Sequence, residues 1–242
     1  MAEEQLEEFR LFINGRSVDA LSGRTFESQN PYLGRPWARV ADGGPEDVDI
    51  AVGAARAAFD GEWGQLTGFQ RAAVLRACAE GIAANAERLA RLEVQDSGKL
   101  LREMLGQMTA LPQWFFYFSG LADKLEGRTI PPVNPNYFGY TRREPVGVVA
   151  AITPWNSPLL LLTWKLAPLL AAGNTCVVKP SEHSPASTVA FAERHRPGER
   201  HGGGRRVHRD QVGVRRADRR HPGPVPAGLR LTPRIRGRPR TG

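Results

Sequence analysis

The stretch REPVGVVAAITPWNSPLLLLTWKLAPLLAAGNTCVVKPSE, residues 143–182, decides the fold that we expect for this chain. Residues 146–152 are apolar and rich in β-branched side chains, and they predict a buried strand. Residues 175–178 have the same character and predict a second strand. Both runs are shorter than a typical helix, so length favours strands in both places.

A helix is expected between the two strands, from about residue 157 to residue 172, where Gly173 and Asn174 stop it. Strand, helix and strand then form one βαβ unit, whose strands run parallel. Polar residues follow each strand, at 153–156 and at 179–182. Because ligands of open α/β sheets bind at the carboxyl ends of the strands, we predict a binding site there.

The rest of the first 193 residues adds strands and helices to this unit. Asn14-Gly15 is a strong two-residue turn signal, and Pro45 is placed to open a helix. An aromatic run at 114–118 indicates core or subunit interface more than a cofactor platform. The expected elements are a hairpin at 9–26, a strand at 37–40, helices at 45–59, 67–96 and 100–125, and an exposed strand at 137–143 that can pair with another chain.

Composition divides the chain near Arg194. Residues 1–193 carry a net charge of −4, whereas residues 194–242 carry 15 Arg, no Lys and a net charge of +12. All 19 aromatic residues lie in the first part. We therefore predict one domain portion at 1–193 and a basic tail at 194–242 that is disordered, because it cannot bury a core.

Several classes of protein are disfavoured. The acidic start MAEEQLEEF is not a secretory signal, and the apolar stretch at 159–172 is interrupted by Lys165 and is too short to span a bilayer. Cys78 and Cys176 fit neither a zinc site nor a disulfide framework, so no metal site is predicted. We expect a soluble, cytoplasmic protein.

Each polar cluster allows two interpretations when taken alone. Asn156 at a helix start can donate to a developing oxyanion, or it can simply cap the helix. Lys179 and Glu182 can bind the vicinal hydroxyls of a ribose, or they can belong to a solvated loop. The occurrence of both clusters in one βαβ unit favours the functional interpretation.

The two clusters together resemble the aldehyde dehydrogenase superfamily, whose members carry P-W-N-x-P, then a helix, then A-G-N-T and V-x-K-P-S-E. This chain has PWNSP at 154–158, AGNT at 172–175, VKPSE at 178–182, FING at 12–15, Asn30-Pro31, and REPVGVV at 143–149. The resemblance covers about residues 9–193. It implies an α/β fold, in which this chain forms an incomplete, Rossmann-like dinucleotide-binding domain with a parallel sheet. This domain is the amino-terminal portion of the family's fold.

The resemblance also implies a role for each site residue. Asn156 is expected to be catalytic, as an amide of the oxyanion hole. Lys179 and Glu182 would hold the ribose hydroxyls with Ser181 between them, and Glu182 would repel a 2′-phosphate, which favours NAD over NADP. The wall against the adenosine half of the cofactor would be formed by Ile152, Thr153, Pro154 and Trp155.

The implied reaction is oxidation of an aldehyde to a carboxylate, through a thiohemiacetal on a catalytic Cys, in a homo-oligomer. The Cys, the F-T-G-S segment and the general-base Glu of the family lie further along its chain and are not found here. Cys78 falls in a predicted helix and Cys176 in a predicted strand. We therefore expect this polypeptide to be truncated and inactive alone. We also expect it to fold poorly, because its first two strands would lack the sheet partners that normally follow and would leave open edges prone to aggregation.

The Arg-rich tail allows two interpretations. A frame change in a GC-rich gene yields such a composition, and codons for residues 196–200, read one nucleotide later, can spell Gly-Pro-Ala-Asn-Val, close to a G-x-P-x-x-V segment of the family. Alternatively, the chain is a non-enzymatic protein whose basic arm binds nucleic acid by neutralising phosphates. The tail has no aromatic residue for base stacking, so no specific nucleic-acid partner is expected.

Overall fold

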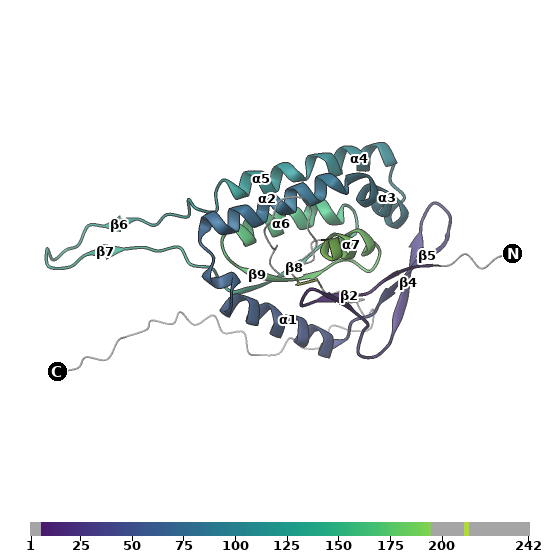
Figure 1. Cartoon of the computed structure of the whole chain (residues 1–242), viewed down its shortest axis with the longest axis horizontal. Coiled ribbons are helices and arrows are strands. Elements are labelled where there is room, and N and C mark those ends of the chain that lie inside the picture. The colour runs from purple at the N-terminus through teal and green to yellow at the C-terminus, as the bar shows by residue number, and fades with distance from the viewer. Residues whose placement is uncertain (1–5, 195–210, 213–242) are drawn as a thin grey trace.

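A mixed five-stranded sheet lies at the centre of the computed structural model, which describes residues 6–194 and 211–212 (Figure 1). The strand order is β3-β2-β10-β9-β8. Strands β8, β9 and β10 run parallel, whereas β2 is antiparallel to both β10 and β3. The strands are β2 (Leu11–Ile13), β3 (Arg16–Val18), β8 (Val148–Ile152), β9 (Thr175–Lys179) and β10 (Gln211–Val212).

The predicted βαβ unit is confirmed. Helix α6 (Pro158–Ala171) connects β8 to β9, and the two strands pair in parallel from Val148 opposite Thr175 to Ile152 opposite Lys179. Asn174 fixes the return from the helix, since its Nδ2 donates to the Leu169 carbonyl at 3.1 Å and its Oδ1 accepts from the Gly147 N–H at 3.0 Å. One amide side chain therefore ties the end of α6 to the start of β8.

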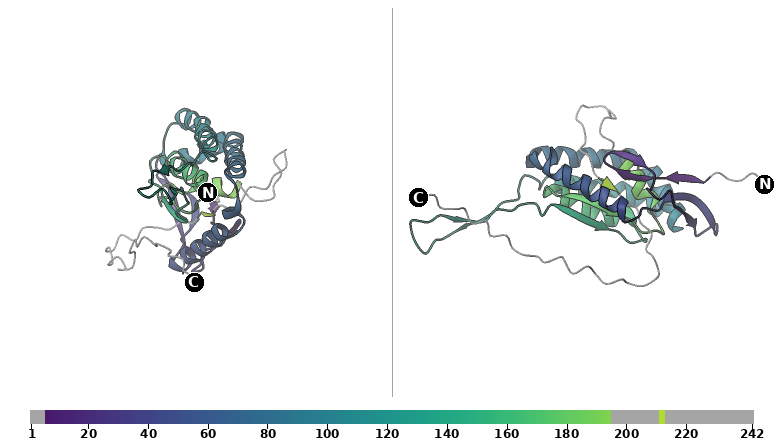
Figure 2. Two further views of the ribbon diagram at one scale, coloured as in Figure 1. Left: turned by 90° about the vertical axis from the view of Figure 1, so that its left-hand side faces the viewer. Right: turned by 90° about the horizontal axis from the view of Figure 1, so that it is seen from below.

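Helices cover both faces of the central sheet (Figures 1 and 2). Helix α1 (Pro45–Asp60) packs on one face against β8 and β9, and α6 packs on the other. Beyond α6 lie α2 (Gly68–Ala84), α3 (Ala86–Ser97), α4 (Leu101–Ala110) and α5 (Pro112–Ser119). Helix α7 (Ala186–Arg194) follows β9 and packs against α3 and α6.

The helix predicted over residues 67–96 is in fact two helices. Thr67 is the N-cap of α2 and forms a reciprocal capping box with Gln70, as a helix start requires. The backbone leaves the helical region at Asn85 (φ −117°, ψ 12°), whose Nδ2 donates to the Gly81 carbonyl at 2.8 Å. This local side-chain bond competes with continuation of the helix, so α3 starts as a separate helix at Ala86.

The helix predicted over residues 100–125 is also divided, into α4 and α5. The division falls at Leu111 and Pro112, because proline has no N–H to donate to the preceding turn. Phe115 from the aromatic run is fully buried, whereas Phe116 and Tyr117 remain exposed. The run therefore contributes to the core through one face only.

The predicted hairpin around Asn14-Gly15 is confirmed, although it is shorter than the expected range of 9–26. Asn14 and Gly15 both have positive φ, 51° and 74°, as a two-residue turn between β2 and β3 requires. Phe26 belongs to a second sheet of order β1-β5-β4. Its strands are β1 (Glu7–Phe9), β4 (Thr25–Asn30) and β5 (Arg35–Ala41), the last of which contains the strand predicted at 37–40.

A two-stranded ribbon projects from the body of the molecule (Figure 1). It consists of β6 (Thr129–Ile130) and β7 (Gly139–Tyr140), which are antiparallel. The exposed strand predicted at 137–143 is thus limited to two residues, and the Pro-rich region before it contains β6. Tyr137, Phe138 and Tyr140 are all largely exposed on this ribbon.

Strand β10 lies in the basic tail, where no regular structure was expected. It also gives the βαβ unit a sheet partner that was expected to be missing. Gln211 pairs with Val177 and Val212 with Val178, so β9 has a parallel neighbour on each side. The other side of β10 pairs with β2. The frame-change and nucleic-acid interpretations concern residues 195–210 and 213–242, which lie outside the described residues, and both stay predictions.

Within the described ranges, no helix combines the length and the apolar character that crossing a membrane requires.

Candidate functional site

The two polar clusters lie at one edge of the central sheet. Ile152 is the last residue of β8 and stands opposite Lys179, the last residue of β9. Directly beyond them the Thr153 N–H donates to the Lys179 carbonyl at 3.1 Å. The loop after β8 (residues 153–157, the β8 loop) and the loop after β9 (residues 180–185, the β9 loop) therefore start side by side.

A second bond joins the two loops further out, because the Ser184 hydroxyl donates to the Trp155 carbonyl at 2.8 Å. The β9 loop is folded on itself by the Ser181 hydroxyl, which accepts from the His183 N–H at 3.2 Å. Ser181 is buried, so its contribution is to the shape of the loop. The predicted site residues are thus brought together in one connected pair of loops.

The β8 end of the site presents an apolar surface to solvent. Ile152 is 64% exposed and Trp155 57% exposed, and Pro154 is also exposed. Thr153 is buried, and its Oγ1 has no hydrogen-bond partner among the described residues. Two large apolar side chains and a proline next to polar groups form a surface that suits a flat ring with a polar substituent.

Asn156 does not cap α6, which answers one of the alternatives left open by the sequence. The N-cap position of α6 is Ser157, and the Asn156 side chain is exposed. The main-chain carbonyl of Asn156 accepts a hydrogen bond from Lys99 Nζ, which also donates to Ser157 Oγ at 2.7 Å. The backbone at Asn156 is therefore held, while its amide faces outward.

Lys179 and Glu182 form an ion pair on the β9 side, with Nζ 3.5 Å from Oε2. His183 Nε2 lies 4.0 Å from the other carboxylate oxygen. Partial burial acts to raise the pKa of the Glu182 carboxyl, but its own backbone N–H, Lys179 and His183 outweigh that effect and lower the pKa below its ordinary value. Glu182 is consequently an anion at neutral pH, beside an ammonium group.

Sequence reasoning missed two carboxylates that support the site from behind. Glu93 and Asp96 lie on α3 and are 0% and 5% exposed. Glu93 Oε1 accepts from the Leu159 N–H in the first turn of α6, and Asp96 Oδ2 accepts from the Ala186 N–H at the start of α7. The available signal was an acidic pair three residues apart, on a helix whose apolar stripe includes Leu89 and Leu92.

Burial dominates the electrostatics of this pair. It raises the pKa of the Glu93 carboxyl, against the opposing effects of the Leu159 N–H, Lys99 and Ser187. Burial likewise raises the pKa of Asp96 to about 7, opposed by hydrogen bonds from Ser28, the Ala186 N–H and Trp37. The nearby Glu93 carboxyl adds a smaller increase to the pKa of Asp96.

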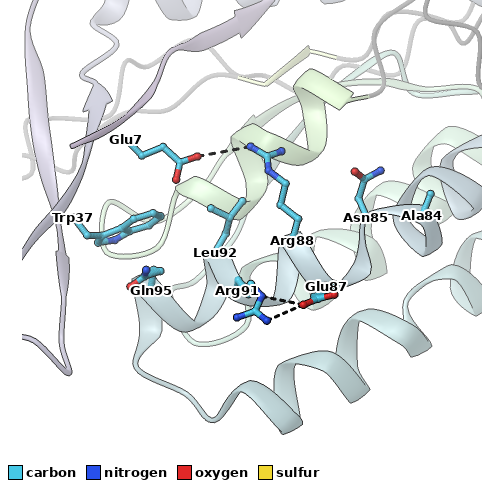
Figure 3. Close-up of a pocket in the computed structure, with 9 residues that line it drawn as sticks. All are labelled: Glu7, Trp37, Ala84, Asn85, Glu87, Arg88, Arg91, Leu92 and Gln95. Atoms are coloured by element: carbon cyan, nitrogen blue, oxygen red, sulfur yellow. Dashed lines mark hydrogen bonds and ion pairs between the residues drawn. The ribbon is translucent and has the colours of Figure 1, made fainter. Parts of the chain in front are cut away.

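The cavity in Figure 3 is separate from this site. It has a volume of about 490 Å³ and lies between α3 and the strands β1 and β5, with no lining residue from either loop. Its charged side chains are paired with each other, Arg88 with Glu7 at 3.7 Å and Arg91 with Glu87 at 2.7 Å. None of the predicted site residues lines this cavity, so the candidate site stays at the strand ends.

The described residues offer neither an accessible thiol nor a cluster of metal ligands at this site. Cys78 in α2 and Cys176 in β9 are both buried, each with 1% of its surface exposed. Among the described residues, no group of three or more His, Cys, Asp or Glu side chains is arranged to hold a metal ion. The groups at the strand ends are therefore suited to binding and to hydrogen-bond donation.

Comparison with known proteins identifies the class to which this fold and site belong. Residues 18–196 match the model of the aldehyde dehydrogenase family, and the chain belongs to this family. It is 46% identical over 187 residues to aldehyde dehydrogenase family 2 member C4 of Arabidopsis thaliana, and 48% identical over 183 residues to hydroxyisobutyraldehyde dehydrogenase of Mycolicibacterium austroafricanum. These alignments cover 76% of this chain.

A solved structure gives the same result. The NAD⁺ complex of an aldehyde dehydrogenase from Bacillus cereus superimposes with a TM-score of 0.75 at 42% identity, covering 78% of this chain and 38% of that protein. The chain spans little more than a third of its relatives, 37% of the Arabidopsis protein and 36% of the Mycolicibacterium protein. The predicted family membership over part of the chain is thus confirmed.

Proposed function

We propose that the β8 and β9 loops bind the adenosine half of NAD, in the cofactor-binding portion of an enzyme that oxidises an aldehyde to a carboxylate. The observation that carries this proposal is the parallel pairing of Ile152 with Lys179, which puts both predicted clusters at one sheet edge. The family membership and the NAD⁺ found in the Bacillus cereus relative support it. Aldehyde as substrate, homo-oligomeric assembly and a cytoplasmic location remain predictions for the whole enzyme.

The residues present fit an adenosine. A ribose diol needs a donor and an acceptor, and Lys179 and Glu182 supply these from one partly exposed ion pair. The exposed faces of Ile152 and Trp155 suit the purine, with Thr153 and Pro154 shaping the turn between them. When bound, NAD supplies the hydride acceptor of the reaction.

Asn156 is proposed as a donor to the oxygen of the reacting carbonyl. Its side chain is exposed, and its main chain is fixed by Lys99, so the amide is preorganised in one region of space. Ser181 is proposed to act indirectly, through the shape of the β9 loop.

The anionic Glu182 favours NAD over NADP. A 2′-phosphate on the ribose would meet the Glu182 carboxylate, whose pKa lies below its ordinary value. The two negative charges repel each other, and the Lys179 ammonium is already shared with Glu182.

Calorimetric titration of the purified full chain with NAD tests the proposal. Lys179→Ala is expected to weaken binding about tenfold or more, because hydrogen bonds to charged groups contribute roughly 1.5–3 kcal/mol. The matched control is Lys124→Ala, an exposed lysine paired with Asp123 outside both loops, which should bind NAD like the wild type. Equal affinities for Lys179→Ala and the wild type would contradict the proposed site.

A further inference from the structure

One turn of α3 contacts both helices that begin at the site. A single atom, Glu93 Oε1, accepts from the Leu159 N–H of α6 at 3.0 Å and from the Ser187 hydroxyl of α7 at 3.3 Å. Asp96 Oδ2 accepts from the Ala186 N–H, the first residue of α7, at 2.9 Å. The other oxygen of Asp96 accepts from Ser28 and Trp37 and so anchors the turn to the second sheet.

The burial of these two carboxylates makes the contacts energetically significant. A carboxyl group with almost no exposed surface is costly to bury unless it is hydrogen-bonded, and the positive end of a helix dipole stabilises its ionised form. Glu93 meets such an end at α6, and Asp96 meets one at α7. Loss of either bond would leave a buried polar group without a partner.

Lys99 extends the same set of contacts beyond the helix. Gly98 ends α3 in the left-handed conformation (φ +71°), where a Cβ would approach Pro31 Cγ to 2.9 Å. This sharp turn brings Lys99 Nζ to the Asn156 carbonyl and to Ser157 Oγ. The end of α3 and the turn after it thus reach the β8 loop, the start of α6 and the start of α7, through residues 93, 96 and 99.

We propose that Glu93 and Asp96 are positioning residues, which fix the β8 loop relative to the β9 loop through the first turns of α6 and α7. Each helix follows one loop directly, so holding Leu159 and Ala186 on one rigid turn sets the separation of Trp155 from Lys179. We name Glu93 and Asp96 the α3 clamp. The α3 clamp preorganises the binding site between the two loops. Only the identity of its ligand, NAD, rests on the proposed function.

The experiment compares four variants of the full chain. Glu93→Leu removes the acceptor at similar volume, and Glu93→Gln restores an acceptor oxygen. Glu87→Gln is the matched control, since Glu87 is an exposed acid of α3 paired with Arg91. Ser187→Ala removes only the contact of Glu93 with α7 and is the variant to use if Glu93→Leu does not fold.

Two readouts are taken at a temperature where every variant studied is folded. Hydrogen–deuterium exchange, measured without NAD, reports on the main-chain N–H groups of residues 157, 159–161 and 186–189. Calorimetry measures the affinity for NAD. Glu93→Leu is expected to accelerate exchange in both segments about tenfold and to weaken NAD binding about tenfold. Glu93→Gln is expected to stay within about threefold of the wild type, and Glu87→Gln to match it.

Three results would overturn the clamp. One is an exchange rate in Glu93→Leu that equals the wild-type rate in both segments, or a wild-type rate for residues 186–189 in Ser187→Ala. Another is acceleration spread evenly over the molecule, which indicates a general loss of stability. The third is failure of Glu93→Gln to restore protection. If the wild type does not bind NAD, the proposed function fails, whereas the exchange readout still decides on the clamp.

Discussion

The hydroxyl of Ser184 donates a hydrogen bond to the main-chain carbonyl of Trp155 at 2.8 Å, between residues 29 positions apart in the chain. This bond joins the tips of the β8 and β9 loops, whereas the bond from the Thr153 N–H to the Lys179 carbonyl joins their bases. The proposed adenosine surface is therefore held at both ends of the loop pair.

Ser184→Ala is expected to weaken NAD binding about fivefold and to lower the free energy of unfolding by about 1 kcal/mol, the usual net value of a neutral hydrogen bond. Calorimetric titration and urea unfolding measure the two effects. Ser22→Ala is the control, because Ser22 is exposed and its hydroxyl accepts a hydrogen bond from the nearby Arg24 N–H, within one turn. Unchanged NAD affinity in Ser184→Ala would show that the loop tips need no bridge.

Glu182→Gln is expected to raise the affinity for NADP relative to NAD by about fivefold or more. The reason is that two unit charges 4 Å apart repel by about 1 kcal/mol even in water, and the substitution removes one of them. Titrations of each variant with NAD and with NADP give the ratio of the two affinities. Glu80→Gln, which changes an exposed acid of α2, is the control for net charge. A ratio that stays at the wild-type value would place the 2′-phosphate away from Glu182.

Stability is expected to fall as pH rises from about 4 to about 7 because of Asp96. Burial raises its pKa from 3.8 to about 7 in the folded chain, where it faces Ser28, Trp37, the Ala186 N–H and Glu93. The folded state then binds the proton more tightly than the unfolded state, so deprotonation favours unfolding, by up to about 4 kcal/mol. The raised pKa of Glu93 acts in the same direction.

Urea unfolding at a series of pH values from 4.5 to 8 (roughly the window defined by linkage) measures this effect as the difference between wild type and Asp96→Asn. The amide does not titrate, so the difference should change steadily across the window. Glu87→Gln should parallel the wild type at every pH. A difference independent of pH would mean that Asp96 keeps its ordinary pKa in the fold.

Val212→Pro is expected to destabilise the chain by roughly 1–3 kcal/mol, because β10 is a strand of the central sheet. Val212 is paired with Val178 on one side and Phe12 on the other, and proline removes its N–H from the ladder. Val212→Ala keeps the N–H and is the matched control. Equal urea midpoints for the two variants would argue against this pairing.

The purified chain is expected to form no NADH from NAD and an aldehyde. A nucleophilic thiolate must be accessible to substrate, and the two cysteines of the chain are each 1% exposed. Reaction with a chromogenic thiol reagent should be slow for the folded chain and should report two thiols in urea. Aldehyde-dependent NADH formation that disappears in Cys176→Ser would overturn this expectation.

Local interactions account for the parts of the fold that were predicted correctly. The turn at Asn14-Gly15, the start of α2 at Thr67 and the strands of the βαβ unit each depend on residues only a few positions apart. The breaks at Asn85 and Pro112 were also local, but a continuous apolar stripe through Leu75, Ile82 and Leu89 concealed the first of them. Periodicity reports which face of a helix is buried and is insensitive to a change of direction between two helices.

The sequence alone was sufficient for the βαβ unit, for the family resemblance and for the prediction that Trp155, Asn156, Lys179 and Glu182 lie at one sheet edge, because these residues directly follow two parallel neighbouring strands. Only the tertiary structure decided what holds that edge together. Glu93 lies 66 residues from Leu159 and 94 from Ser187, and no local pattern indicates that one carboxylate oxygen binds both. Such contacts arise from the packing of α3 against α6 and α7, and packing over that separation depends on the whole folded chain.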